Sequence, residues 1–187
     1  CTYDRAGLGR SDPGPTPRTS AQIVKDLHAL LSGAKVPPPY ILVGHSLGGM
    51  NVRLYASEHP ENVVGLILVD ATHEDYPARE RELRSEAEKR KLQNTFIQSR
   101  PAARSEFDSL PQSAAQVQAA PKLPDVPLVV ITAGHRDESR ALNDAWLEMQ
   151  ADLATKTSQG RQVIAKDSGH YVQFDQPEIV IDAITRM

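Results

Sequence analysis

Residues 44–48, Gly-His-Ser-Leu-Gly, fit the G-x-S-x-G pattern in which a serine occupies a sharp turn between a strand and a helix. The flanks suit that turn, because the short apolar run 40–43 precedes it and a predicted helix to about Glu58 follows it. Small residues two positions either side of Ser46 would let the turn close without side-chain clashes. At the start of the helix, the N–H of Leu47 is a candidate oxyanion-hole donor. The segment therefore predicts nucleophilic attack by Ser46 on an acyl group.

A serine hydroxyl is a poor nucleophile at neutral pH and needs a base to take its proton. Of the six histidines, His170 fits that role best because it follows the last predicted strand, near the carboxyl edge where parallel sheets bind ligands. The order serine first, histidine last also suits such a site. His45 is expected to point away from the nucleophile and to be structural. The others are expected on helices (His28, His59) or after strands, where they could line a pocket (His73, His135).

Apolar runs alternate with amphipathic segments along most of the chain. Short apolar runs at 40–43, 63–69 and 126–132 predict strands that are covered on both faces, and residues 161–165 predict a fourth strand. Between and around them, helices are predicted after Thr19 or Ser20, after Ser46, and from Pro177 onwards. Another helix carries one apolar stripe of core residues rather than a cofactor site: Leu142, Trp146, Met149 and Leu153. This alternation predicts an α/β fold with a mostly parallel sheet between helices.

Residues 71–125 interrupt the alternation. The stretch from Pro77 to Arg104 is rich in Arg, Glu and Lys, with few apolar positions. Two interpretations remain open and are compatible: a solvated helical excursion, or a cap that covers an active site. We therefore expect a core formed by residues 1–70 and 126–187, with residues 71–125 as a helical cap or insertion.

Composition excludes several function classes. The formal net charge of −3 is spread along 187 residues without a basic block, which argues against a nucleic-acid partner. The longest apolar runs fall short of the roughly 18–20 residues that a membrane span needs. The single Cys1 cannot form an internal disulfide, and no Cys/His cluster has zinc-ligand spacing. We expect no metal and no cofactor, and a small acyl or ester compound as the partner; the oligomeric state stays open.

The segment around Ser46 resembles the nucleophile elbow of the α/β-hydrolase superfamily. Residues 3–12 resemble the loop after the fourth strand in its esterase, lipase and haloperoxidase-like members, residues 67–70 the sixth strand, and residues 167–170 the loop bearing the base. The resemblance implies a Ser–His–acid triad without a cofactor. It places the acid at Asp137, just past the strand that ends near residue 133. Asp70 is the rival position, because some dehalogenase-like members carry their acid there.

The same resemblance implies strands upstream of Cys1. Residues 1–4 then represent the end of a strand, and residues 40–43 an open apolar edge. A second oxyanion donor would lie upstream, so we expect the 187-residue chain to fold or work poorly by itself. A cytoplasmic location is favoured, and any targeting signal would also lie upstream.

These features predict hydrolysis of a carboxylic ester or related acyl compound. Ser46 would attack, His170 would relay the proton, and Asp137 would orient the imidazole, after which water frees the acyl-enzyme. The alternatives are a non-turnover member of the same fold that binds a small molecule, and an inactive truncated fragment.

Overall fold

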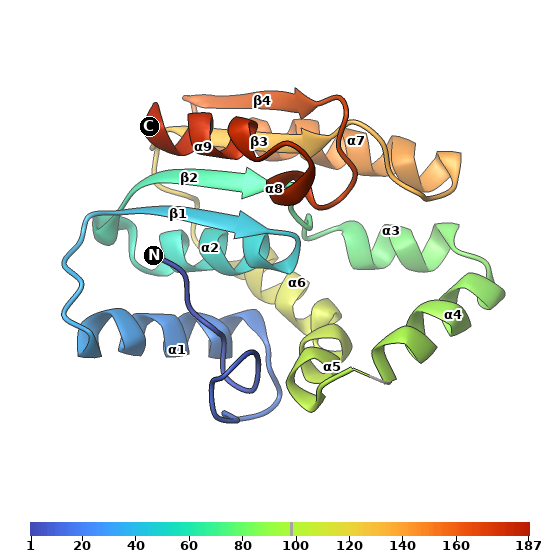
Figure 1. Cartoon of the computed structure of the whole chain (residues 1–187), viewed down its shortest axis with the longest axis horizontal. Coiled ribbons are helices and arrows are strands. Elements are labelled where there is room, and N and C mark those ends of the chain that lie inside the picture. Colours follow the sequence, from blue (N-terminus) through green and yellow to red (C-terminus); the bar gives the residue numbers. More distant parts are fainter. Residues whose placement is uncertain (98) are drawn as a thin grey trace.

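Four parallel strands form the sheet of the computed structural model, which describes residues 1–97 and 99–187 (Figure 1). Their order in the sheet is β1-β2-β3-β4, with bounds β1 Tyr40–His45, β2 Val63–Val69, β3 Leu128–Ala133 and β4 Gly160–Ala165. All four predicted strands are confirmed, with ends shifted by at most two residues. Residues 1–5, expected to include a strand end, form no strand, because no described segment pairs with them along a backbone ladder.

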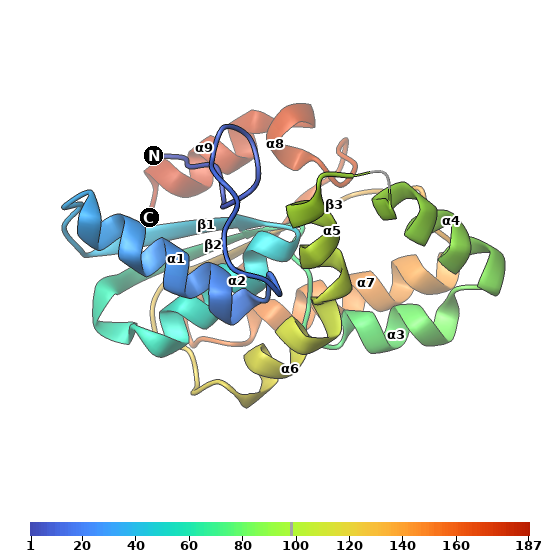
Figure 2. The same ribbon diagram turned by 90° about the horizontal axis from the view of Figure 1, so that it is seen from below.

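Helices cover both faces of this sheet (Figures 1 and 2). On one face, α2 (Leu47–Glu58) packs against β1 and β2, α7 (Arg140–Ala154) packs against β3 and β4, and α1 (Ser20–Gly33) packs on α2. On the other face lie α8 (Val172–Asp175) and α9 (Pro177–Thr185). Thr19 caps α1 by accepting the N–H of Gln22, as its position predicted. A short 3-10 helix, Pro60–Asn62, leads into β2.

The central strand β2 shows why the strands are apolar on both faces. Leu66 and Leu68 pack into the cluster formed with α1 and α2, whereas Ile67 and Val69 pack into the cluster that includes α8 and α9. Successive side chains of a strand point to opposite faces, so a sheet with helices on both sides needs apolar residues at every position. The fold is therefore the predicted α/β sandwich.

Strand β1 lies at one edge of the described sheet. Ile41 and Val43 are 39% and 42% exposed, although their neighbours in β2 are buried. The open apolar edge expected at residues 40–43 is confirmed.

Four helices connect β2 to β3: α3 Tyr76–Leu83, α4 Glu86–Ile97, α5 Pro101–Asp108 and α6 Leu110–Ala119. The helical character predicted for residues 71–125 is present in the part that the structure describes; Gln98 lies outside it. Arg5 pairs with Glu106 of α5 at 2.7 Å, and the side chain of Ser113 on α6 accepts the N–H of Ser20. These contacts join α5 to the N-terminal loop and α6 to the start of α1.

Figure 1 shows α3 and α4 on the side of the molecule toward which the strands point. In residues 1–97 and 99–187, no helix combines the length and apolar character that crossing a membrane requires.

Candidate active site

Ser46 stands where β1 ends and α2 begins. Its φ of 53° and ψ of −125° lie outside the regions that non-glycine residues commonly occupy. Such strain costs on the order of 1–3 kcal/mol and persists only where the surroundings enforce it. Here the Ser46 N–H donates to the carbonyl of Val69 at 3.2 Å, and the Ser46 carbonyl accepts the N–H of Thr72 at 2.9 Å. The turn is thus tied to the end of the neighbouring strand β2.

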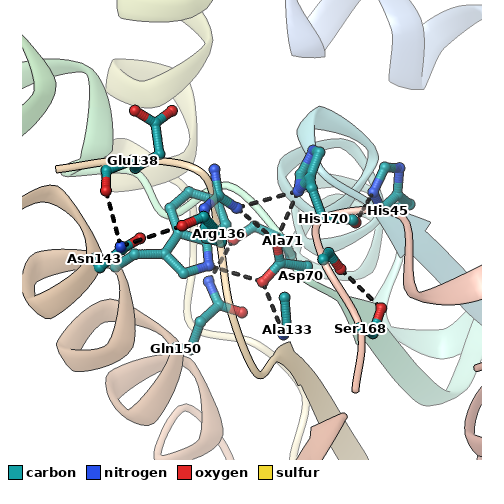
Figure 3. A network of polar contacts seen from close by, with 12 residues as sticks. His45, Asp70, Ala71, Ala133, Arg136, Glu138, Asn143, Gln150, Ser168 and His170 are labelled. Atoms are coloured by element: carbon teal, nitrogen blue, oxygen red, sulfur yellow. Dashed lines mark hydrogen bonds and ion pairs between the residues drawn. The ribbon is translucent and has the colours of Figure 1, made fainter. Parts of the chain in front are cut away.

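His170 lies in the loop after β4, at the same edge of the sheet. Its Nδ1 is 2.6 Å from Oδ2 of Asp70 (Figure 3). Asp175 of α8 stabilises this loop, because its carboxylate accepts the N–H of Gly169 at 3.0 Å and the hydroxyl of Ser168 at 3.1 Å. The imidazole is therefore fixed both at its ring nitrogen and through its backbone.

Asp70 follows directly after Val69, the last residue of β2, and its side chain is fully buried. Like Ser46 it has a positive φ, 39°. Its Oδ1 accepts the indole N–H of Trp146 at 2.8 Å and the backbone N–H of Ala133 at 3.1 Å. Its Oδ2 accepts from His170 and from Arg136, the latter at 2.5 Å (Figure 3). Every lone pair of this carboxylate is directed at a donor.

These partners decide the charge of Asp70. Burial by itself raises the pKa of the Asp70 carboxyl. The hydrogen bond from His170 and the positive charge of Arg136 outweigh burial, so the pKa lies below its ordinary value. Asp70 is thus an anion at neutral pH, and a carboxylate anion only accepts hydrogen bonds. It follows that Nδ1 of His170 carries a proton and donates it to Asp70.

The sequence predicts the acid at Asp137, but the structure places the rival position, Asp70, against His170. Asp137 lies in a bend beyond the end of β3 at Ala133, and its side chain is exposed. Among the described residues it forms no hydrogen bond or ion pair with His170; Asp70, the rival position, does. The physical reason is that Asp70 leaves a strand next to β1 and is buried at once, whereas Asp137 follows a longer loop out toward solvent.

His45 is also placed differently from the expectation. Its ring does not point away from the base but lies 4.5 Å from the ring of His170, centroid to centroid. Its Nε2 is 2.8 Å from the backbone carbonyl of His170, and since a carbonyl only accepts, Nε2 carries the hydrogen. Burial lowers the pKa of His45, which keeps the ring neutral. The His45 side chain thus supports the backbone of the loop that carries His170.

The other histidines lie away from this pair. His28 and His59 stack on each other at 4.2 Å on the helical side. His73 is buried, with Nε2 2.9 Å from Asp152, and His135 is exposed. Within residues 1–97 and 99–187, His170 is the histidine whose ring nitrogen contacts Asp70.

The hydroxyl of Ser46 forms no hydrogen bond within residues 1–97 and 99–187. Because Nδ1 of His170 is engaged by Asp70, Nε2 is the nitrogen that remains to accept a proton. The N–H of Leu47, the first residue of α2, has no carbonyl one turn back to bond, which leaves it available to an oxyanion.

Residues 1–183 match the family described as the alpha/beta hydrolase family. The chain belongs to the alpha/beta hydrolase family. It is 32% identical over 187 residues to the uncharacterized protein YqjL of Bacillus subtilis (strain 168), covering 98% of this chain and 70% of that protein. Among solved structures, it matches an alpha/beta fold family hydrolase from Bacillus anthracis with a TM-score of 0.68 at 13% identity, covering 98% of this chain and 80% of the other. An esterase from Exiguobacterium antarcticum matches with a TM-score of 0.60 at 18% identity over 98% and 78% of the two chains.

The hydrolase elbow depends on only one of the two glycines of its motif. A Cβ on Gly44 would overlap the carbonyl oxygen of Gly48, closer than non-bonded atoms approach. A Cβ on Gly48 would have no atom within 4 Å, so the expectation that small residues are needed on both sides of Ser46 holds for Gly44 alone. The next residue, Gly49, is crowded instead, because its Cβ would overlap that of Ala71.

We therefore expect opposite results from two matched substitutions. Gly44→Ala should destabilise the chain by about 1–3 kcal/mol or more, because backbone atoms would have to move. Gly48→Ala should be neutral or slightly stabilising, by about 0.5–1 kcal/mol, since alanine loses less entropy than glycine in a helix. Urea denaturation of both variants measures the difference, and equal stabilities would contradict the crowding at Gly44.

The lowered pKa of Asp70 also predicts a pH dependence of stability in this hydrolase. The pKa of the Asp70 carboxyl is lower in the folded chain than in the unfolded chain, so unfolding takes up protons at acidic pH. The stability that this carboxylate contributes is therefore complete above the unfolded pKa of about 3.9 and is lost as the pH falls through the folded pKa. The difference in unfolding free energy between the parent and Asp70→Asn should therefore stay constant from pH 7 to 5 and shrink below about pH 4. Urea denaturation at a series of pH values measures it; a difference that grows toward acid would contradict the assignment.

Two residues of the site were missed by sequence reasoning. Trp146 was assigned to the core, and it is buried, but its indole also donates to the acid. Arg136 was not considered at all, although it contacts both Asp70 and His170. An arginine in a loop is ordinarily a solvated residue, so no local signal distinguishes this one. Among the described residues no group of His, Cys, Asp and Glu side chains could hold a metal ion.

Proposed function

We propose that this member of the alpha/beta hydrolase family is a serine hydrolase that cleaves a carboxylic ester or related acyl compound through an acyl-enzyme. The observation that carries the proposal is the arrangement at the carboxyl edge of the sheet. Ser46 occupies a strained turn at the end of β1, and the loop after β4 at the same edge carries His170, whose Nδ1 lies 2.6 Å from a buried carboxylate. A strained serine at the same edge of the sheet as a histidine with a fixed tautomer is the pattern that supports an activated nucleophile.

In this mechanism Asp70 fixes the tautomer of His170, leaving Nε2 as a proton acceptor. As the Ser46 oxygen bonds to the acyl carbon, its proton passes to Nε2, and Asp70 stabilises the imidazolium that forms. The N–H of Leu47 donates to the developing oxyanion. His170 then returns the proton to the departing alcohol. Water repeats the same steps to release the acid and restore Ser46.

Helices α3 to α6 are proposed to act as a cap of the site, because α3 contacts residues next to the acid. The ring of Tyr76, the first residue of α3, packs edge-on against Trp146 at 4.9 Å. At the other end of α3, Arg84 forms a two-fold hydrogen bond with Glu138, which lies in the loop after β3.

Hydrolysis of p-nitrophenyl esters of increasing acyl length tests the proposal. The chain should hydrolyse at least one of these esters, and the acyl length with the highest kcat/KM reports the space beneath the cap. Labelling of Ser46 by a fluorophosphonate probe without any ester hydrolysis would instead indicate a member of the fold that binds a small molecule and does not turn it over. Neither labelling nor turnover would indicate an inactive chain.

A further inference from the structure

Arg136 reaches back from the loop after β3 to the pair formed by Asp70 and His170 (Figure 3). Its Nη1 lies 2.5 Å from Oδ2 of Asp70 and 3.1 Å from Nδ1 of His170, and its side chain is only 13% exposed. The mechanism above does not use this guanidinium. A positive charge so close to the base of a triad nonetheless alters what the base can do.

The guanidinium is held in place from several directions. Its Cζ lies 3.8 Å from the centroid of the Trp146 ring, in a cation–π contact, and the same indole donates to Asp70. The Arg136 carbonyl accepts from the side chain of Asn143 at 3.3 Å. The other carboxylate nearby, Glu138, is paired with Arg84 at 2.6 Å. Arg136 is therefore directed at Asp70 rather than at Glu138.

Hydrogen-bond chemistry restricts how Arg136 and His170 meet. A guanidinium only donates, and Nδ1 of His170 already uses its hydrogen to bond Asp70. The 3.1 Å approach between Nη1 and Nδ1 is thus a contact between two donors that share one acceptor, Oδ2. When His170 takes a second proton, two positive groups lie side by side on one carboxylate oxygen. Arg136 therefore opposes protonation of the ring.

The remaining groups around the ring are few. The ionisable side chains that contact the His170 ring within the described part of the chain are His45 from β1, Asp70 after β2, Arg136 after β3, and the adjacent Tyr171. Helix α7 contributes the uncharged Trp146. The ion pair between Asp70 and Arg136 therefore places two opposite charges against the ring of the proposed base.

We propose that Arg136 is a positioning residue of the triad, which fixes the Asp70 carboxylate against His170 and keeps the imidazole unprotonated, and hence reactive, at lower pH than Asp70 alone would allow. This inference rests on the proposed function, because it assigns His170 as the base. A purely structural ion pair would stabilise the fold in the same place but would leave the pH dependence of the base unchanged.

The test is the pH profile of kcat/KM for p-nitrophenyl acetate in four proteins: the parent, Arg136→Gln, Arg136→Lys and Arg140→Gln. Gln keeps a donor toward Asp70 without a charge, Lys keeps the charge, and Arg140 is a matched control, 95% exposed at the start of α7. In Arg136→Gln the acid limb should move to higher pH by about one unit, the lower end of the effect of a charge at this distance. Arg136→Lys should stay close to the parent, and Arg140→Gln should coincide with it.

An acid limb that stays in place in Arg136→Gln would overturn the proposal, as would an equal shift in Arg140→Gln. The titration of the His170 ring by NMR, with its signal assigned through His170→Gln, separates this proposal from the proposed function because it needs no turnover. A higher titration midpoint in Arg136→Gln supports the inference even if no ester is hydrolysed, whereas an unchanged midpoint overturns it even in an active enzyme. If Arg136→Gln does not fold, Arg136→Met takes its place in both measurements.

Discussion

Ser46→Ala is expected to lower kcat for a p-nitrophenyl ester by about 10⁴–10⁶ and to leave the folded structure intact. Without the hydroxyl no acyl-enzyme forms, and water held near His170 and Leu47 is a much poorer nucleophile in this geometry. The methyl group of alanine fits the space that the serine side chain occupies. Because Ser46 is held by its backbone contacts to Val69 and Thr72, those bonds survive the substitution.

Steady-state kinetics on purified protein measures this loss, with Ser32→Ala as the control. Ser32 is an exposed serine near the end of α1, outside the elbow. Its substitution should leave kcat unchanged. Activity that survives Ser46→Ala within tenfold of the parent would mean that another group performs the attack.

Asp70→Asn is expected to lower kcat by about 10⁴, whereas Asp137→Asn should leave it within about twofold of the parent. The asparagine amide introduced by the first substitution would have the shape of the carboxylate but no charge. Its NH₂ group could face Nδ1 of His170 and favour the tautomer with the hydrogen on Nε2, which cannot accept the Ser46 proton. Asp137 is exposed and has no contact with His170 among the described residues, so its conversion to an amide should change nothing at the base.

The pair of variants decides between the two positions for the acid. KM should change little in either, because neither residue is proposed to bind the acyl chain. A large loss of kcat in Asp137→Asn together with a small loss of kcat in Asp70→Asn would support Asp137 as the acid, as the sequence predicts. Circular dichroism at pH 7 shows whether each variant is folded before the rates are compared.

The elements of this fold and the positions of two proposed catalytic residues were predictable because their signals are local. Apolar runs of six or seven residues define β2 and β3, and the motif around Ser46 is contiguous. His170 follows the last strand directly in the chain. In a parallel sheet, residues that follow the strands share one edge, so sequence order alone brings Ser46 and His170 to the same side.

The acid was not predictable in the same way, because two aspartates follow neighbouring strands. Which of them reaches His170 depends on backbone angles and loop length: Asp70 turns inward at a φ of 39°, whereas Asp137 lies farther along a loop and faces solvent.

The direction of the His45 side chain was not predictable for a related reason. The rule that side chains alternate applies within a strand, but His45 is the last residue of β1, where the elbow bends.

Arg136 shows a different limit of sequence reasoning. Its role depends on Trp146 from α7 and Asp70 from the end of β2, which are 10 and 66 positions away in the chain. No spacing rule connects such residues, and only their arrangement around one carboxylate reveals a common function.

The central claim, that Ser46 is activated by His170, is tested most directly by labelling with a fluorophosphonate probe followed by peptide mass mapping. The account predicts a single adduct on the peptide that contains Ser46, formed rapidly in the parent, slowed strongly in His170→Gln and absent in Ser46→Ala. An adduct on a different serine, or labelling of Ser46 at the same rate in His170→Gln as in the parent, would contradict it.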